Sequence, residues 1–126
     1  MRIKVTSVRR KSNLKSSLSN AESMHKTTAS LNGIGSRGLS RLISAIPKRS
    51  GSTASSWDME VEKSQNGLNL YYSNSKKVSD GTPLVVLIVN GHGTGTGGYV
   101  PANNFVGPIV DDIARKVMRE VEKIVE

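Results

Sequence analysis

The stretch WDMEVEKSQNGLNLYY, residues 57–72, decides the fold. In its first half apolar and acidic side chains alternate, which is the period-two pattern of a strand with one buried face. Asn66 and Gly67 then supply a tight turn, because both residue types tolerate a positive φ. A second alternation follows, with Leu68, Leu70 and Tyr72 on its apolar side. The stretch therefore predicts an antiparallel β-hairpin.

Helical spacing precedes this hairpin. Between residues 34 and 46 apolar side chains recur three and four positions apart, which predicts a helix. Pro47 should end it, because proline disfavours the helical conformation of the residue before it. Gly35 and Gly38 are each unfavourable inside a helix by about 1 kcal/mol. Either the helix begins after them or another backbone packs closely there.

A second helix is predicted at the end of the chain, from Pro108 onward. Asp111 and Asp112 lie close to its N-terminal end and Lys123 close to its C-terminal end, where each charge suits the helix dipole. Apolar positions repeat along it at helical spacing: Ile109, Ile113, Val117, Val121 and Ile124.

The segment between the hairpin and the last helix leaves one alternative open. A turn is expected at Asp80–Gly81. Thr82 as N-cap and Pro83 as first helical residue favour a short helix over the apolar run 84–89. The Val and Ile content of that run favours a buried strand instead. The glycine-rich stretch 91–98 is predicted to be a loop.

The first third of the chain has a different composition. Ile3, Val5 and Val8 stand among basic and hydroxyl residues, which suggests a short extended arm or an edge strand. Residues 12–32 are rich in Ser, Lys, Asn and Thr, which suggests one or two loosely amphipathic helices or a segment that folds only on assembly. We therefore expect a basic, low-complexity arm over residues 1–33, and one domain over residues 34–126.

Charge is spread unevenly along the 126 residues. Residues 1–50 carry eleven Lys and Arg against Glu22 alone, and the remainder carries seven against nine acids, so the net charge of +8 divides into +10 and −2. Such a basic segment suits nucleic acid, an acidic partner or a neighbouring subunit. We favour the neighbouring subunit, because no aromatic residue interleaves the charges as a base-stacking surface would require.

Composition also excludes some classes of protein. The chain has no cysteine, so disulfide frameworks and thiolate metal sites are excluded. Its longest apolar run, residues 84–89, is far shorter than the roughly 20 residues of a membrane helix. The basic N-terminus lacks the apolar stretch of a signal peptide.

The glycine loop holds two features that resemble ligand sites. Gly93, Gly95 and Gly98 match the G-x-G-x-x-G spacing of a dinucleotide site, but the sequence YVP follows where a helix would have to open towards the pyrophosphate. His92 has the chemistry of a base or a metal ligand. No cysteine exists and no acid lies between Asp80 and Asp111 to accompany it. We expect His92 to pack the loop or to hydrogen-bond across an interface.

The three acids Asp58, Glu60 and Glu62 could form a carboxylate pair of the kind that glycoside hydrolases use. Their alternation with apolar residues places all three on one face of a strand. We expect that face to be solvated or to contact another subunit.

Three stretches stand in order along residues 34–126. GSRGLSRLISAIP at residues 35–47 has the form of a glycine-bearing helix that ends at a proline, and PKRSGSTASSW at 47–57 joins a Ser-Gly turn to a Ser-Trp strand start. GHGTGTGGYVPANNFVGP at 91–108 joins a glycine loop to a Phe-x-x-Pro junction. Together they resemble the tail-completion and head-tail joining proteins of tailed bacteriophages. Two positions depart from the family pattern: Arg49 stands where an acid is expected, and Asn103–Asn104 where a charged residue is common.

The resemblance implies an α+β fold in which a helix from the N-terminal half and a C-terminal helix pack on a small antiparallel sheet. It implies assembly into a ring, sixfold most simply or twelvefold. The implied function is structural, in the virion neck, where the ring completes the tail and joins it to the head around the DNA channel. No enzyme activity, catalytic residue, metal or cofactor is implied.

Expected partners are copies of the chain, the head-closure or connector ring, and the tail-tube or tail-terminator protein. Genomic DNA in the lumen would be contacted non-specifically at most, and no membrane is expected; the protein would be made in the host bacterial cytoplasm. The alternatives are a tail-terminator ring that stops tube growth and a basic DNA-binding protein. Subunit contacts are expected in the basic arm and the glycine loop, at Arg2, Lys4, Arg9, Arg10, Lys11, His92, Gly93, Thr94, Gly95, Thr96, Tyr99, Pro101 and Phe105.

Overall fold

A computed structural model describes residues 1–9, 21–46, 51–64, 67–93 and 97–125. The elements along the chain are β1 (Arg2–Arg9), α1 (Ala21–Ala45), α2 (Gly51–Ala54), β2 (Trp57–Ser64), β3 (Gly67–Asn74), α3 (Leu84–Asn90), β4 (His92–Gly93), β5 (Tyr99–Val100) and α4 (Val106–Val125).

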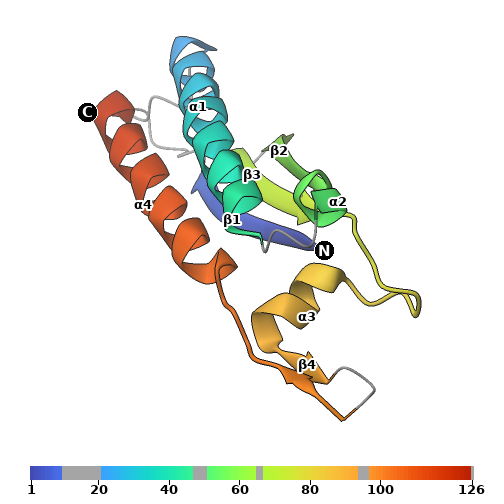
Figure 1. The fold of residues 1–126 in the computed structure, drawn as a ribbon. Helices are drawn as coiled ribbons and strands as arrows, with labels where there is room; N and C mark the ends of the chain where they lie inside the picture. The colour runs from blue at the N-terminus through green and yellow to red at the C-terminus, as the bar shows by residue number, and fades with distance from the viewer. Residues whose placement is uncertain (10–20, 47–50, 65–66, 94–96, 126) are drawn as a thin grey trace.

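The main sheet has three antiparallel strands in the order β1-β3-β2 (Figure 1). The predicted hairpin is confirmed as β2 and β3, and Gly67 has the expected positive φ, at 136°. Asn66 lies outside the described residues. The edge strand suggested for the N-terminus is β1, which pairs with the far side of β3.

Two long helices cover one face of this sheet and pack against each other. Figure 1 shows α1 and α4 side by side over the strands, with α1 towards β2 and α4 towards β1. The expected α+β fold, with two helices packed on a small antiparallel sheet, is therefore confirmed. The ring remains a prediction.

The helix α1 is longer than the 34–46 segment that the spacing predicts. It begins at Ala21 and ends at Ala45, two residues before Pro47. It runs through Gly35 and Gly38. Glycine suits both positions because neighbouring elements fill the space that a Cβ would need: a Cβ on Gly35 would lie 2.5 Å from Met59 Sδ. The close neighbours are side chains of the sheet and of α4, and not the backbone that we expected.

The boundary expected between residues 33 and 34 falls inside α1. Residues 1–9 form a strand of the main sheet, so this end of the chain belongs to the same domain as the hairpin. Residues 10–20, within the expected low-complexity arm, lie outside the described residues.

Tyr72 ties the sheet to α1. Its hydroxyl donates a hydrogen bond to the Gly35 carbonyl, at 2.6 Å, and the side chain is fully buried. Burial raises the pKa of Tyr72 to about 12, against the opposing effect of Arg41. Tyr72 and Trp57 are the buried aromatics of a core that is otherwise aliphatic: Val5, Val8, Leu31, Ile34, Leu42, Ile46, Leu68, Leu70, Val85, Val106, Ile109, Ile113, Val117 and Val121.

The apolar run 84–89, for which both a helix and a strand were considered, forms the short helix α3. Its N-cap is Pro83 and its first residue is Leu84, so the expected N-cap at Thr82 is one residue too early. The preceding turn is as predicted, because Gly81 has a φ of 89° and the amide of Thr82 donates to Asp80 Oδ1 at 2.9 Å. That backbone hydrogen bond also lowers the pKa of Asp80.

The last helix, α4, begins at Val106, earlier than Pro108 suggests. Its first turn holds no acid, so the expected dipole role of Asp111 and Asp112 is wrong, whereas Lys123 does lie in the last turn. Asp112 instead accepts a hydrogen bond from Arg41 of α1 at 2.5 Å. None of the helices in the described ranges is long and apolar enough to cross a membrane.

Candidate functional site

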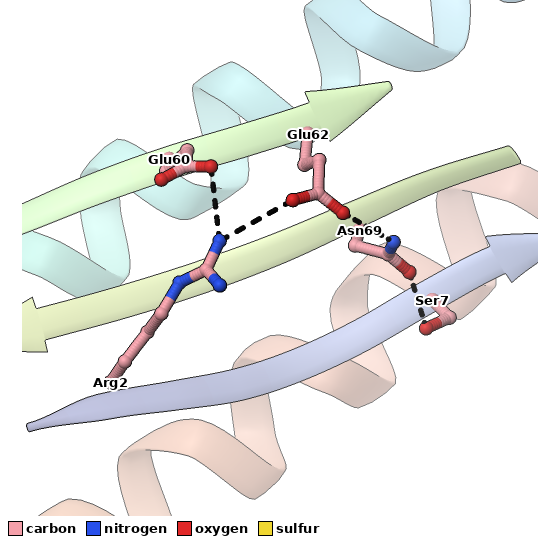
Figure 2. Close-up of polar contacts among 5 residues, drawn as sticks. All are labelled: Arg2, Ser7, Glu60, Glu62 and Asn69. Atoms are coloured by element: carbon pink, nitrogen blue, oxygen red, sulfur yellow. Dashed lines mark hydrogen bonds and ion pairs between the residues drawn. The ribbon is translucent and has the colours of Figure 1, made fainter. Parts of the chain in front are cut away.

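The main sheet has one covered face and one open face. On β3, Leu68, Leu70, Tyr72 and Asn74 point towards the helices and are buried. The alternate side chains, those of Asn69, Tyr71 and Ser73, are only half-buried. In Figure 2 the labelled side chains lie on the near side of the three strands, and the helices lie behind them. The open face is therefore the candidate interaction surface.

The two edge strands carry opposite charges on this open face. β1 contributes Arg2, Lys4 and Arg9, all exposed. β2 contributes Asp58 and Glu60, which are exposed, and Glu62, which is half-buried. The positions expected from the alternation of β2 are thus confirmed. The face is basic along one edge and acidic along the other.

Arg2 spans the sheet from one edge to the other (Figure 2). Its Nη2 lies 3.0 Å from Glu60 Oε1 and 3.5 Å from Glu62 Oε2. The guanidinium lies over the ring of Tyr71, 3.7 Å from the centroid, as a cation–π pair does. Exposed ion pairs of this kind contribute about 0 to 1 kcal/mol each. They orient Arg2 and the two acids more than they stabilise the fold.

A second polar connection crosses the sheet beside the first. Ser7 Oγ donates to Asn69 Oδ1 at 2.6 Å, and Asn69 Nδ2 donates to Glu62 Oε1 at 3.3 Å (Figure 2). One residue from each strand takes part. The open face is therefore an ordered polar surface that holds Glu62 from both sides.

Three charges on the open face have no ionic partner in the described part of the chain. Lys4 and Arg9 on β1 make no ion pair there, and Asp58 on β2 accepts only the amide of Met59, at 2.8 Å. The unpaired cations lie at one edge and the unpaired anion at the other. This arrangement presents charge to a partner at both edges.

β4 and β5 pair as a small two-stranded ladder that lies away from the main sheet (Figure 1). His92 pairs with Val100 and Gly93 with Tyr99, so part of the expected loop is a short β-ladder. The Tyr99 side chain is 66% exposed. The chain returns to α3 through the amide of Asn103, which donates to the carbonyl of Ile88 at 2.9 Å.

The structure separates the expected contact residues into two groups. Arg2, Lys4 and Arg9 lie on β1, in the main sheet, whereas His92, Gly93 and Tyr99 lie on β4 and β5, and Pro101 and Phe105 follow β5. Tyr99 and Pro101 are exposed, whereas Phe105 is half-buried and packs against the core. Arg10, Lys11, Thr94, Gly95 and Thr96 lie outside the described residues, and His92 is placed through its backbone alone.

The polar chain through Asn69 and the stacking of Arg2 on Tyr71 were not predicted from the sequence. The alternation along β3 places Asn69 and Tyr71 on the same face as the acids of β2, so the sequence did indicate that these side chains lie near the acids. Pairing of β1 with β3 is the missing step, because it connects positions about sixty residues apart in the sequence.

A cleft of about 570 Å³ lies between α1 and α4 and is lined by charged side chains of both signs. In the described part of the chain, no three His, Asp or Glu side chains come together as metal ligands would. The cleft is lined by Ser30, Ile34, Arg37, Lys116, Arg119, Glu120, Glu122 and Lys123.

Comparisons with protein families, with curated proteins and with solved structures found no match to this chain. Its function is therefore inferred from its residues and from the geometry of the open face and the β4–β5 ladder.

Proposed function

We propose that this protein is a structural subunit of the neck of a tailed bacteriophage, where a ring of copies completes the tail and joins it to the head. The sequence resemblance over residues 34–126 supplies the proposal. The geometric observation that supports it most is the pairing of β4 with β5, where the side chain of Tyr99 is largely exposed to solvent.

The exposed aromatic of the β4–β5 ladder contributes little to the fold of a single chain. Tyr99 is 66% exposed and its strand pairs over two residues only. Burial of an aromatic side chain is a large source of binding energy, and Tyr is enriched at protein interfaces. The β4–β5 ladder therefore suits contact with a neighbouring subunit or ring.

The helix α3 supports the same conclusion. Its residues 84–89 are all apolar, yet Val85 is the one that is fully buried, and the others are partly exposed. A helix that is apolar on every side normally lies inside a protein. In an assembly, neighbouring copies would cover the remaining apolar surface of α3.

The test is made in particles of the phage that encodes the chain. Tyr99→Ala should leave heads and tails formed but separate, because it removes the exposed contact without touching the core. Met118→Ala is the matched control, since Met118 is an exposed apolar side chain on α4, 44% exposed, away from the β4–β5 ladder. Electron microscopy would count joined and separate particles.

Each outcome has a distinct meaning. Separate tails of normal length with Tyr99→Ala support the joining role, whereas abnormally long tubes indicate a tail terminator. Joined particles at the wild-type frequency, or absence of the chain from purified virions, would refute the proposal. Salt-dependent DNA binding by a protein that is absent from virions would favour the basic DNA-binding alternative.

A further inference from the structure

Both outer edges of the main sheet lack a strand partner in the described part of the chain. β1 and β2 are the outer strands, each eight residues long, and neither contains proline. The register of β1 shifts between Lys4 and Thr6, so its regular edge for the contact described below is the part that holds Arg2 and Lys4. An edge of this length offers a row of free backbone N–H and C=O groups to another strand. Natural proteins often protect such edges with charges, and here the two edges carry charges of opposite sign.

The register of the sheet aligns these charges in rows. Arg2, Ser73 and Asp58 lie opposite one another across the three strands. The next row on the open face joins Lys4 and Glu60 through Tyr71. Each row therefore begins at a basic residue of β1 and ends at an acidic residue of β2. The Arg2 guanidinium reaches across the sheet to Glu60 and Glu62 of its own chain, so Lys4 and Arg9 are the cations that stay unpaired at the β1 edge in the described residues.

The strand directions permit these rows to continue into another molecule. β1 and β2 are both antiparallel to β3, so they are parallel to each other. A second copy in the same orientation would bring its β1 alongside β2 of the first as a parallel pair. Positions 58 and 60 would then lie opposite positions 2 and 4 of the next copy, which brings the unpaired Asp58 of one copy and the unpaired Lys4 of the next to the same contact.

We propose that the chain assembles head to tail by pairing the outer edge of β2 in one copy with the outer edge of β1 in the next. This inference rests on the proposed ring and names the contact that closes it. The same contact repeats at every subunit, and such a contact gives a closed ring when the rotation between copies divides the circle.

The charges also oppose the competing two-fold arrangements. Pairing of β1 with a second β1 would set Lys4 and Arg9 against another basic edge. Pairing of β2 with a second β2 would set three acids against three acids. Like charges directly opposite each other destabilise strand pairs, whereas opposite charges stabilise them. The rows therefore select the head-to-tail contact over a two-fold dimer.

The test uses two charge-reversed forms of the full chain. One carries Lys4→Glu and Arg9→Glu, so that both of its edges are acidic. The other carries Asp58→Lys and Glu60→Lys, so that both of its edges are basic. All four side chains are exposed, and circular dichroism and urea unfolding would verify that each variant is folded.

The masses of the assemblies, measured by native mass spectrometry, give the result. Wild-type protein should form a ring, and each reversed form alone should lose it. An equimolar mixture should recover the ring with equal numbers of the two forms, because the acidic β1 of one form meets the basic β2 of the other. Recovery in the mixture is expected only for a head-to-tail contact between these edges.

A matched control carries Arg37→Glu and Arg119→Glu on the helices. Each of these two substitutions changes the net charge by −2, so this control goes from +8 to +4, as the variant with Lys4→Glu and Arg9→Glu does. The control should keep the ring.

Rings formed by both reversed forms alone would overturn the strand pairing and leave the proposed neck ring intact. Loss of rings without recovery in the mixture, or loss in the control variant, would also overturn it. Wild-type protein that stays monomeric at all concentrations would overturn the self-pairing, whereas the proposed neck function would still be tested by the particle counts.

Discussion

Replacement of Gly38 by Ala should weaken the fold, although alanine is normally the better helix former. Gly38 lies on the buried side of α1, where a Cβ would lie 2.6 Å from Ile113 Cγ1 and would collide with the Tyr72 hydroxyl. Gly33 lies five residues earlier in the same helix and is exposed, and a Cβ there would have no neighbouring atom within 4 Å. The two positions therefore share helix propensity and differ in packing.

The expected magnitudes follow from these contacts. Alanine gains about 1 kcal/mol over glycine in a helix interior. Overpacking of a filled core costs about 1 to 3 kcal/mol, and displacement of the Tyr72 hydroxyl from the Gly35 carbonyl costs about 1 kcal/mol more. Gly38→Ala should thus lower the free energy of unfolding by about 1 to 3 kcal/mol, whereas Gly33→Ala should raise it by up to about 1 kcal/mol.

Urea unfolding, followed by circular dichroism, measures both variants against the wild type. All three proteins must be compared at one concentration, because self-association adds to the apparent stability. An unchanged m value with a lower midpoint would locate the effect in stability itself. The packing argument is refuted if Gly38→Ala unfolds at the same urea concentration as Gly33→Ala or at a higher one.

Three further predictions test other parts of the fold. Because the pKa of Tyr72 is about 12 in the folded chain and about 10 when unfolded, stability should fall as pH rises through that window. By pH 12 the wild type should lose about 2 to 3 kcal/mol more than Tyr72→Phe in thermal or urea unfolding. Asn74→Ala should cost about 2 to 4 kcal/mol, since it unpairs two backbone groups that the buried amide bonds, and Ser73→Ala on the open face should stay within about 0.5 kcal/mol. Hydrogen bonds from Lys116 and Arg41 lower the pKa of Asp112 below 3.8. The stability that its carboxylate provides should therefore be lost as pH falls from 3.8 through the lowered pKa. Acid titration of Asp112→Asn should not show this loss.

Local patterns in the sequence were sufficient for three parts of the fold. The hairpin of β2 and β3 follows from alternation around Gly67, and α4 follows from five apolar positions at helical spacing. The second half of α1 follows in the same way. Each of these patterns is local, because side chains two positions apart on a strand, or three and four apart on a helix, face the same side. The same local alternation was enough to predict that the three acids of β2 share one face.

Contacts between distant segments decided the remainder. Residues 1–9 were expected to form an extended arm or an edge strand, and pairing of β1 with β3 made them an edge strand and placed Arg2 over Tyr71. The apolar run 84–89 was consistent with a helix or a strand, and no strand of the main sheet pairs with it in the structure. Short apolar runs do not reveal which surface will bury them.

By itself, the sequence determined which side chains share a face of β2, β3, α4 and the second half of α1, because in those elements that depends on the backbone period alone. In β1 a register shift between Lys4 and Thr6 breaks the alternation. The tertiary structure decided which faces meet. Only the packed chain explains why α1 has glycine at positions 35 and 38. There the side chains of Met59, Tyr72 and Ile113 occupy the space of a Cβ. Only the strand order sets a basic edge opposite an acidic one, because β3 lies between two strands that are far apart in the sequence.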